Sequence, residues 1–235
     1  ILELEDAARI ICARSRLLKR ASGQGGMLAV ALSADQIEHR LGRRIDRVAI
    51  AASNGPASTI LAGETATLVE LMDDLEREDV FCRLVSVDVA AHSPQMDALL
   101  DDLLLGVGRI APRPGSVPFY STVVGGRQAD LELDSAYWAR NLRQPVLFWQ
   151  AANQLIDDGH DVFIEVSPHP ILTAPIQQIL TGRGKDAIVV SSLRRNEGAN
   201  RALLTSLAAI YASGLAVGWK AVSPAAGVVS LPPYP

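Results

Sequence analysis

The chain has 235 residues, of which 49% are hydrophobic and 20% are charged, and a length suited to one large domain or two small ones. No apolar run approaches the ~20 residues that a membrane span needs, so we expect no membrane association. The formal net charge of −4 argues against nucleic acid as a partner. The cysteines, Cys12 and Cys82, lie far apart and lack the companion residues of a metal site, so we expect a reducing, cytoplasmic location.

Hydrophobic periodicity and turn signals predict an alternation of helices and strands. Helices are expected over residues 3–20, 34–41, 65–78, 96–105, 137–142, 145–158, 171–180 and 200–213, and strands over residues 27–32, 48–53, 59–62, 82–89, 117–124, 161–166 and 187–193. Thr65 or Thr67 is expected to cap the third helix, Asp134 to cap the fifth, and Pro145 to start the sixth.

The order of these elements predicts the fold class. Residues 26–91 follow the order β-α-β-β-α-β, which is the ferredoxin-like pattern. The later strands are separated by helices of about 10–15 residues, which indicates an α/β layer with parallel strands. We therefore expect an α/β protein in which a small α+β subdomain is inserted ahead of an incomplete α/β one.

Among the four histidines, His92 is the strongest catalytic candidate. It is expected directly after a strand, and Pro94 disfavours helical geometry at the residue before it, so the strand should end in a tight turn. A lone histidine is more often structural than catalytic. His39 and His160 are expected to be solvated, and His169 to be a structural hydrogen-bonding group or to line a site.

Arg14 is the second candidate. It follows Ile10 by four residues and Ile11 by three on a predicted helix, so it should point toward the apolar stripe. A guanidinium group near a core needs a carboxylate partner. That partner is either a side chain of the protein or a bound ligand, and both alternatives stay open at this point.

Five ordered segments form a recognisable pattern. They are Val-Ala-Ala-His-Ser-Pro-Gln-Met-Asp at 89–97, Leu-Glu-Asp-Ala-Ala-Arg at 4–9 with Arg-Ser-Arg at 14–16, Asn-Gly-Pro at 54–56 with Ala-Gly-Glu at 62–64, Tyr-Trp-Ala-Arg-Asn-Leu-Arg-Gln-Pro-Val at 137–146, and Phe-Ile-Glu-Val-Ser-Pro-His-Pro at 163–170. With Leu-Pro-Pro-Tyr-Pro at 231–235, they resemble the acyltransferase domain of a modular type I polyketide synthase, from its C-terminal portion into the linker that follows it.

The resemblance implies a domain organisation. The large subdomain should be α/β-hydrolase-like and incomplete, and the inserted small subdomain ferredoxin-like. The expected segments are the first helix of the large subdomain at 1–25, the small subdomain at 26–91, the remainder of the large subdomain at 92–214, and the linker at 215–235.

The resemblance also implies roles for individual residues. His92 would take the proton of a serine that attacks the thioester of an acyl-CoA, and a backbone carbonyl at Asn141 would orient its imidazole. Arg14 would pair with the free carboxylate of a malonyl-type unit, and Asn54 would contribute to substrate binding. The acyl group would pass to the phosphopantetheine thiol of an acyl carrier protein, and the linker would contact an adjacent ketosynthase domain. No bound cofactor or metal is expected.

The sequence departs from the family in one respect, because it contains no Gly-x-Ser-x-Gly segment. We expect the nucleophilic serine to lie upstream of Ile1, so that the 235 residues alone are inactive. Ser93 lies beside His92, but the family places no nucleophile there, and we do not expect it to replace the missing serine.

The four residues that end at the histidine report on the acyl group. In the family, Tyr-Ala-Ser-His goes with methylmalonyl and His-Ala-Phe-His with malonyl, whereas residues 89–92 read Val-Ala-Ala-His. With Val89 and Ala91 in the substrate site, Ala91 leaves open the space that phenylalanine fills. Since a methyl-sized difference discriminates by only ~1–3 kcal/mol, we expect methylmalonyl or a permissive pocket, with malonyl as the alternative.

Three other functions compete with this interpretation. A fatty acid synthase transferase domain shares the chemistry, but the segments at 137–142 and 231–235 favour the polyketide enzyme. A non-catalytic fragment that docks a carrier protein or ketosynthase would explain the missing serine, but not the intact His92 and Arg14. A serine hydrolase fragment would have no use for a buried cation at Arg14 beside the acyl pocket.

Overall fold

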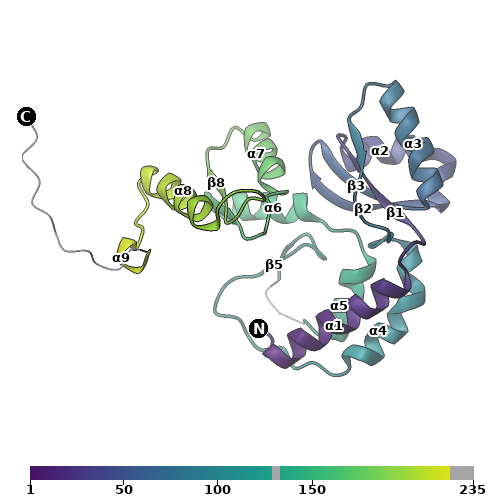
Figure 1. The fold of residues 1–235 in the computed structure, drawn as a ribbon, viewed down its shortest axis with the longest axis horizontal. Coiled ribbons are helices and arrows are strands. Elements are labelled where there is room, and N and C mark those ends of the chain that lie inside the picture. The colour runs from purple at the N-terminus through teal and green to yellow at the C-terminus, as the bar shows by residue number, and fades with distance from the viewer. Residues whose placement is uncertain (129–132, 223–235) are drawn as a thin grey trace, which may run out of the picture. The chain divides into compact units, whose positions relative to one another are not determined.

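The computed structural model describes residues 1–128 and 133–222. They form two compact units, one of residues 1–161 with 174–186 and the other of 162–173 with the described part of 187–235 (Figure 1). The candidate residues His92, Arg14, Asn141 and Asn54 all belong to the first unit. The predicted linker end at 231–235 lies outside the described residues.

A four-stranded antiparallel sheet forms the small subdomain. Its elements are β1 (Gly26–Val30), α2 (Ala34–Leu41), a 3₁₀ turn η1 (Gly42–Asp46), β2 (Val48–Gly55), β3 (Ser58–Gly63), α3 (Thr65–Arg77) and β4 (Cys82–Leu84). The strands lie in the order β2-β3-β1-β4, and each neighbouring pair is antiparallel. The observed order of elements confirms the predicted ferredoxin-like pattern.

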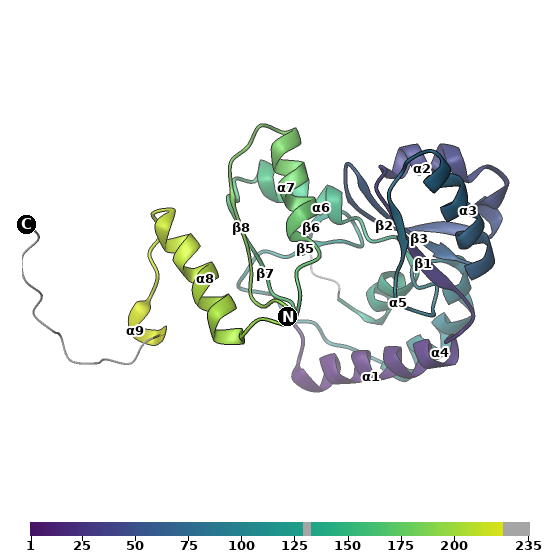
Figure 2. The same cartoon turned by 45° about the horizontal axis from the view of Figure 1, so that its top comes forward.

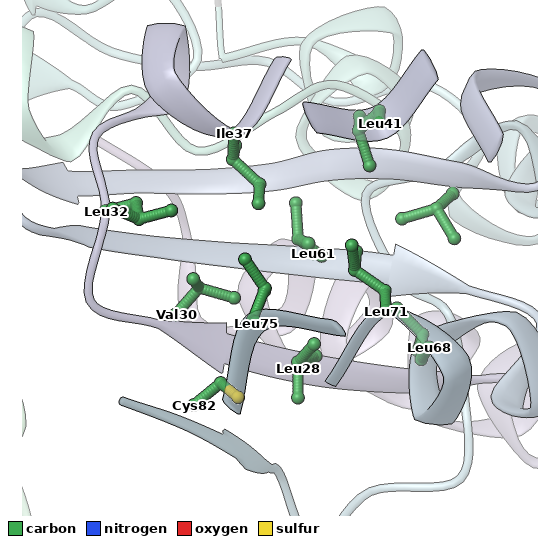
Figure 3. Packing of buried hydrophobic residues seen from close by; sticks show 11 residues of the cluster. Leu28, Val30, Leu32, Ile37, Leu41, Leu61, Leu68, Leu71, Leu75 and Cys82 are labelled. Atoms are coloured by element: carbon green, nitrogen blue, oxygen red, sulfur yellow. The ribbon is translucent and has the colours of Figure 1, made fainter. Parts of the chain in front are cut away.

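Helices α2 and α3 cover one face of this sheet. Their apolar stripes meet alternate residues of the strands, and Figure 3 shows Ile37 and Leu71 pointing toward Leu61, with Leu28 in the same cluster. All four side chains are almost fully buried. Burial of each such side chain contributes about 1.5–3 kcal/mol relative to exposure, which makes this cluster the main source of stability of the subdomain.

The predicted caps hold for one helix and fail for another. Asp134 caps its helix as expected, because its side chain accepts a hydrogen bond from the amide of Tyr137 at 2.7 Å. Helix α3 instead begins after Glu64, without a side-chain cap. The expected capping role of Thr65 or Thr67 is therefore wrong, and the Thr67 hydroxyl donates to the Glu64 carboxylate.

The strand predicted over 82–89 ends at Leu84. One more ladder-like bond joins the Val85 amide to the Met27 carbonyl, and then the carbonyl of Asp88 accepts from Gly23 at the end of the first helix. This contact draws the chain away from the sheet, and Ala90 packs against the face that α2 and α3 leave open, beside buried alanines of β2 and β3. His92 therefore does not follow the strand directly.

Three helices pack together beyond the sheet. They are α1 (Leu4–Arg20), α4 (Leu100–Val107) and α5 (Ser135–Arg143), and a 3₁₀ turn η2 (Pro94–Leu99) precedes α4. Both views show α1 and α5 beside α4 (Figures 1 and 2). Buried Leu17, Met96, Leu103 and Leu142 belong to their shared core.

Two further predictions in this unit are corrected. The strand expected over 117–124 is a short hairpin of β5 (Tyr120–Ser121) and β6 (Gly126–Arg127), because a turn ends β5 where the Gly125 amide donates to the Ser121 carbonyl. Pro145 does not start a helix, since α6 (Phe148–Asp157) begins three residues later.

The second unit contains a parallel pair of strands, β7 (Val162–Glu165) and β8 (Ile188–Ser191). The helix between them in the sequence, α7 (Thr173–Gly182), belongs to the first unit from residue 174 onward. Helices α8 (Ala199–Ala212) and α9 (Trp219–Val222) follow, and α9 was not predicted. No helix in the described residues is both long and apolar enough to cross a membrane.

Candidate active site

The backbone of His92 has an unusual conformation that the end of α5 holds in place. Its φ is +59°, a left-handed value that is uncommon for residues other than glycine. The His92 amide donates to the carbonyl of Leu142 at 3.1 Å, and its Nδ1 lies 2.9 Å from the carbonyl of Gln144. Both anchors of the histidine thus come from one helix end.

The sequence at the end of α5 explains why these two carbonyls are available to bind His92. The last carbonyls of an α-helix lack partners within the helix, and a residue before proline is driven into extended geometry. Gln144 precedes Pro145 and has φ −81° and ψ 156°. Val146 then joins the edge of β2, where its amide donates to Ala51 at 2.8 Å and its carbonyl accepts from Ser53 at 2.9 Å.

The carbonyl that contacts the imidazole belongs to Gln144, so the expectation that Asn141 supplies it is wrong. Asn141 lies within α5, whereas Gln144 lies just beyond the helix in the extended conformation that turns its carbonyl toward His92. When Nδ1–H donates to this oxygen, Nε2 carries the lone pair and can accept a proton. Sequence reasoning missed Leu142 and Gln144, although Pro145 was a signal that the helix ends there.

The surroundings favour the neutral form of His92. Burial lowers its pKa below the ordinary value of 6.5, the contact with Gln144 raises it, and the positive charge of Arg14 lowers it. The net shift is downward. A lowered pKa favours the unprotonated imidazole, which is the form that a general base requires.

Arg14 lies close enough to His92 to act on its charge, and it is held by Asn141. The Nη1 atom of Arg14 donates to Oδ1 of Asn141 at 2.5 Å. The half-buried guanidinium forms no ion pair with any carboxylate of residues 1–128 and 133–222, and burial lowers its pKa. The sequence left open whether Arg14 pairs with a carboxylate of the protein or with that of a ligand. The described residues show no internal salt bridge at Arg14.

Ser93 has a structural role. Its hydroxyl is almost fully buried, donates to the carbonyl of Ala90 at 2.6 Å and accepts from the amide of Gln95 at 3.3 Å, which caps η2. An oxygen bound in this way is not directed at an incoming acyl group.

The remaining predicted substrate residues are less closely tied to His92. Val89 is half-buried against the α1–α4–α5 core, Ala91 is half-buried beside the histidine, and Asn54 lies half-buried on β2. Their roles in substrate binding stay predictions.

His169 has a structural contact in the second unit, where its Nδ1 accepts from the Arg195 amide at 3.2 Å. No group of three or more His, Cys, Asp or Glu side chains among the described residues could hold a metal ion.

Comparison with known proteins decides the family. The protein-family model for the acyl transferase domain matches residues 1–217. The chain belongs to the acyl transferase domain family. This acyl transferase region is 45% identical over 236 residues to the spectinabilin polyketide synthase system protein NorA' of Streptomyces orinoci, covering 99% of the chain and 6% of that protein. It is 42% identical to erythronolide synthase EryA2 of Saccharopolyspora erythraea, covering 100% of the chain and 7% of that protein.

Solved structures agree with the sequence relatives. The acyltransferase domain from module 8 of the salinomycin polyketide synthase is 41% identical, with a TM-score of 0.90 over 93% of this chain and 52% of that one. A loading acyltransferase from the avermectin modular polyketide synthase is 38% identical, with a TM-score of 0.85 over 89% of this chain and 66% of that one. The acyl transferase region is thus of the polyketide synthase type, and its α/β fold class is confirmed.

Proposed function

We propose that this acyl transferase region moves a malonyl-type unit from CoA to the phosphopantetheine thiol of an acyl carrier protein through a serine ester. The serine lies outside this chain, so the 235 residues alone do not turn over. The observation that carries the proposal is the placement of His92, whose Nδ1 is bound to Gln144 while its imidazole lies near Arg14. A neutral base beside a free cation suits acyl transfer from a substrate that carries a carboxylate.

His92 acts as a proton carrier in both half-reactions. Its Nε2 takes the proton of the serine hydroxyl while the oxygen attacks the thioester carbon, and the imidazolium returns this proton to the CoA sulfur as the C–S bond breaks. In the second half, Nε2 takes the proton of the phosphopantetheine thiol while its sulfur attacks the ester. The proton then goes to the departing serine oxygen.

Arg14 recognises the far end of the acyl group. Its planar guanidinium matches a carboxylate with two parallel hydrogen bonds, and the low dielectric constant of a half-buried site strengthens this ion pair. Because Arg14 recognises the carboxylate and not the reacting carbonyl, it favours diacid units over neutral acyl groups.

Methylmalonyl is the favoured unit. The small Ala91 beside His92 leaves room for the α-methyl group, although a methyl-sized difference supports a preference of only ~1–3 kcal/mol. The carrier protein and an adjacent ketosynthase are the proposed partners. The two curated relatives compared above are polyketide synthase proteins many times longer than this chain, which supports a multidomain setting.

Removal of the base tests this function. In the polypeptide extended upstream to the serine, we expect His92→Ala to slow methylmalonyl transfer to the carrier protein by about 10²–10⁴-fold. His39→Ala is the matched control, because His39 is exposed on α2 and should leave the rate unchanged. A His92→Ala protein that transfers the acyl group at the unaltered rate would contradict the proposal.

A further inference from the structure

The last turn of α5, together with Gln144 just beyond it, contacts both of the groups to which the proposed function gives a chemical role. The carbonyls of Leu142 and Gln144 bind the amide and imidazole of His92, and the side chain of Asn141 binds Arg14. One helix end therefore fixes the base and the guanidinium relative to each other.

The contact between Asn141 and Arg14 has a specific chemical character. The residues are 127 positions apart in the sequence, and Oδ1 of Asn141 lies 2.5 Å from Nη1 of Arg14. An amide oxygen accepts a hydrogen bond without carrying a negative charge. It therefore restricts the orientation of the guanidinium plane and leaves the positive charge uncompensated.

We propose that Asn141 is a positioning residue that orients Arg14 and keeps its charge available to the acyl group, and that it thereby sets the preference for acyl units with a free carboxylate over neutral ones. This inference rests on the proposed function, because it assigns part of the selectivity of that same site.

A comparison of side chains shows why an amide is needed at this position. Aspartate at 141 would place a carboxylate on the guanidinium and form an internal ion pair, which would compete with the carboxylate of the substrate. Alanine would leave a long, flexible arginine without its anchor, and its ordering would then oppose binding. Glutamine would retain the amide oxygen at the cost of one added methylene.

Substrates that differ only in a carboxylate isolate this effect. Methylmalonyl-CoA and propionyl-CoA form such a pair, and kcat/KM for serine acylation is measured with each in the upstream-extended polypeptide. We expect Asn141→Asp to lower the methylmalonyl-to-propionyl ratio about 10- to 100-fold, the range for loss of a hydrogen bond to a charged group. Asn141→Ala should lower the ratio less, and Asn141→Gln should retain most of it.

A matched control comes from another Asn–Arg pair of this chain. On α6, Oδ1 of Asn153 accepts from Nη1 of Arg183 at 3.2 Å. Asn153→Asp likewise places a carboxylate on an arginine, here one that already pairs with Asp157, and no bond in the described residues joins this pair to His92 or Arg14, so the ratio should stay at its unaltered value.

The pH dependence gives a second readout that a merely structural role would not change. Arg14 lowers the pKa of His92, so an aspartate that compensates its charge should raise that pKa. The acid limb of the propionyl rate should then move to higher pH in Asn141→Asp and stay in place in Asn153→Asp.

The outcomes separate the two proposals. An unaltered protein whose serine takes up no methylmalonyl group overturns the proposed function and this inference together. Uptake by the unaltered protein, with the same substrate ratio and the same acid limb in Asn141→Asp, overturns the role of Asn141 alone. Equal losses with both substrates in Asn141→Asp also overturn it, because they indicate a structural defect.

Discussion

At the scale of single residues, His92 combines a strained backbone with a lowered pKa. A left-handed conformation outside glycine costs roughly 1–2 kcal/mol, and here the contacts with Leu142 and Gln144 offset it. The sequence indicated His92 through its motif but could not show this conformation, because the contacts that hold it come from residues about fifty positions away.

The lowered pKa predicts the pH dependence of the reaction. His92 works as a base only when it is unprotonated, and a lower pKa means that more acid is needed to protonate it. We therefore expect the acid limb of kcat/KM to have its midpoint below the ordinary histidine value of 6.5. Acylation rates with methylmalonyl-CoA between about pH 5 and 8 measure it, and a midpoint above 6.5 would contradict the buried setting of the imidazole.

The position of Arg14 was predicted from the sequence, but its hydrogen-bond partner was not. Helical spacing placed its side chain toward the core, and the structure finds it half-buried beside α5. The resemblance predicted that the backbone carbonyl of Asn141 contacts His92, whereas the structure shows that its side chain contacts Arg14. A resemblance to a family predicts the role of a residue but not the local geometry of its groups. The bond to the Asn141 side chain joins two distant helices, and no spacing rule within one helix predicts it.

At the scale of elements, helices were predicted more accurately than short strands. Helix α2 has the predicted bounds because its signals are local: Ser33 accepts from the Gln36 amide, and Gln36 accepts in return from the Ser33 amide. The strand expected over 82–89 shows the opposite case. Its apolar residues were read as strand positions, but beyond Val85 the Asp88 carbonyl accepts from the Gly23 amide and Ala90 packs against the sheet, and both are tertiary effects.

The core of the ferredoxin-like sheet gives a prediction at this scale. Leu61 on the inner strand β3 is 0% exposed beneath α2 and α3, so Leu61→Ala leaves a cavity and should reduce the free energy of unfolding by about 2–5 kcal/mol. Ile45, which is 59% exposed on η1, provides the control. Ile45→Ala should change the free energy of unfolding by no more than about 0.5 kcal/mol. Urea unfolding measures both, and equal effects would contradict the assigned core.

At the scale of the whole molecule, the proposed function implies that the chain holds only part of a catalytic site. It spans 52% of the salinomycin module 8 acyltransferase structure and 66% of the avermectin loading acyltransferase structure. In the proposed function His92 is the base and Arg14 binds the carboxylate of the acyl group, and in the described residues the hydroxyl of Ser93 is already bonded to the Ala90 carbonyl. A base without a nucleophile is consistent with a serine supplied by the rest of a longer polypeptide.

The central claim is that His92 activates a serine outside these 235 residues. The most direct test is the intact mass, followed by peptide mapping, of this chain and of the upstream-extended polypeptide after incubation with methylmalonyl-CoA. We predict one acyl group on the extended polypeptide, at an upstream serine and dependent on His92, and none on the 235-residue chain. An acyl group on Ser93, or uptake by the 235-residue chain alone, would contradict the account.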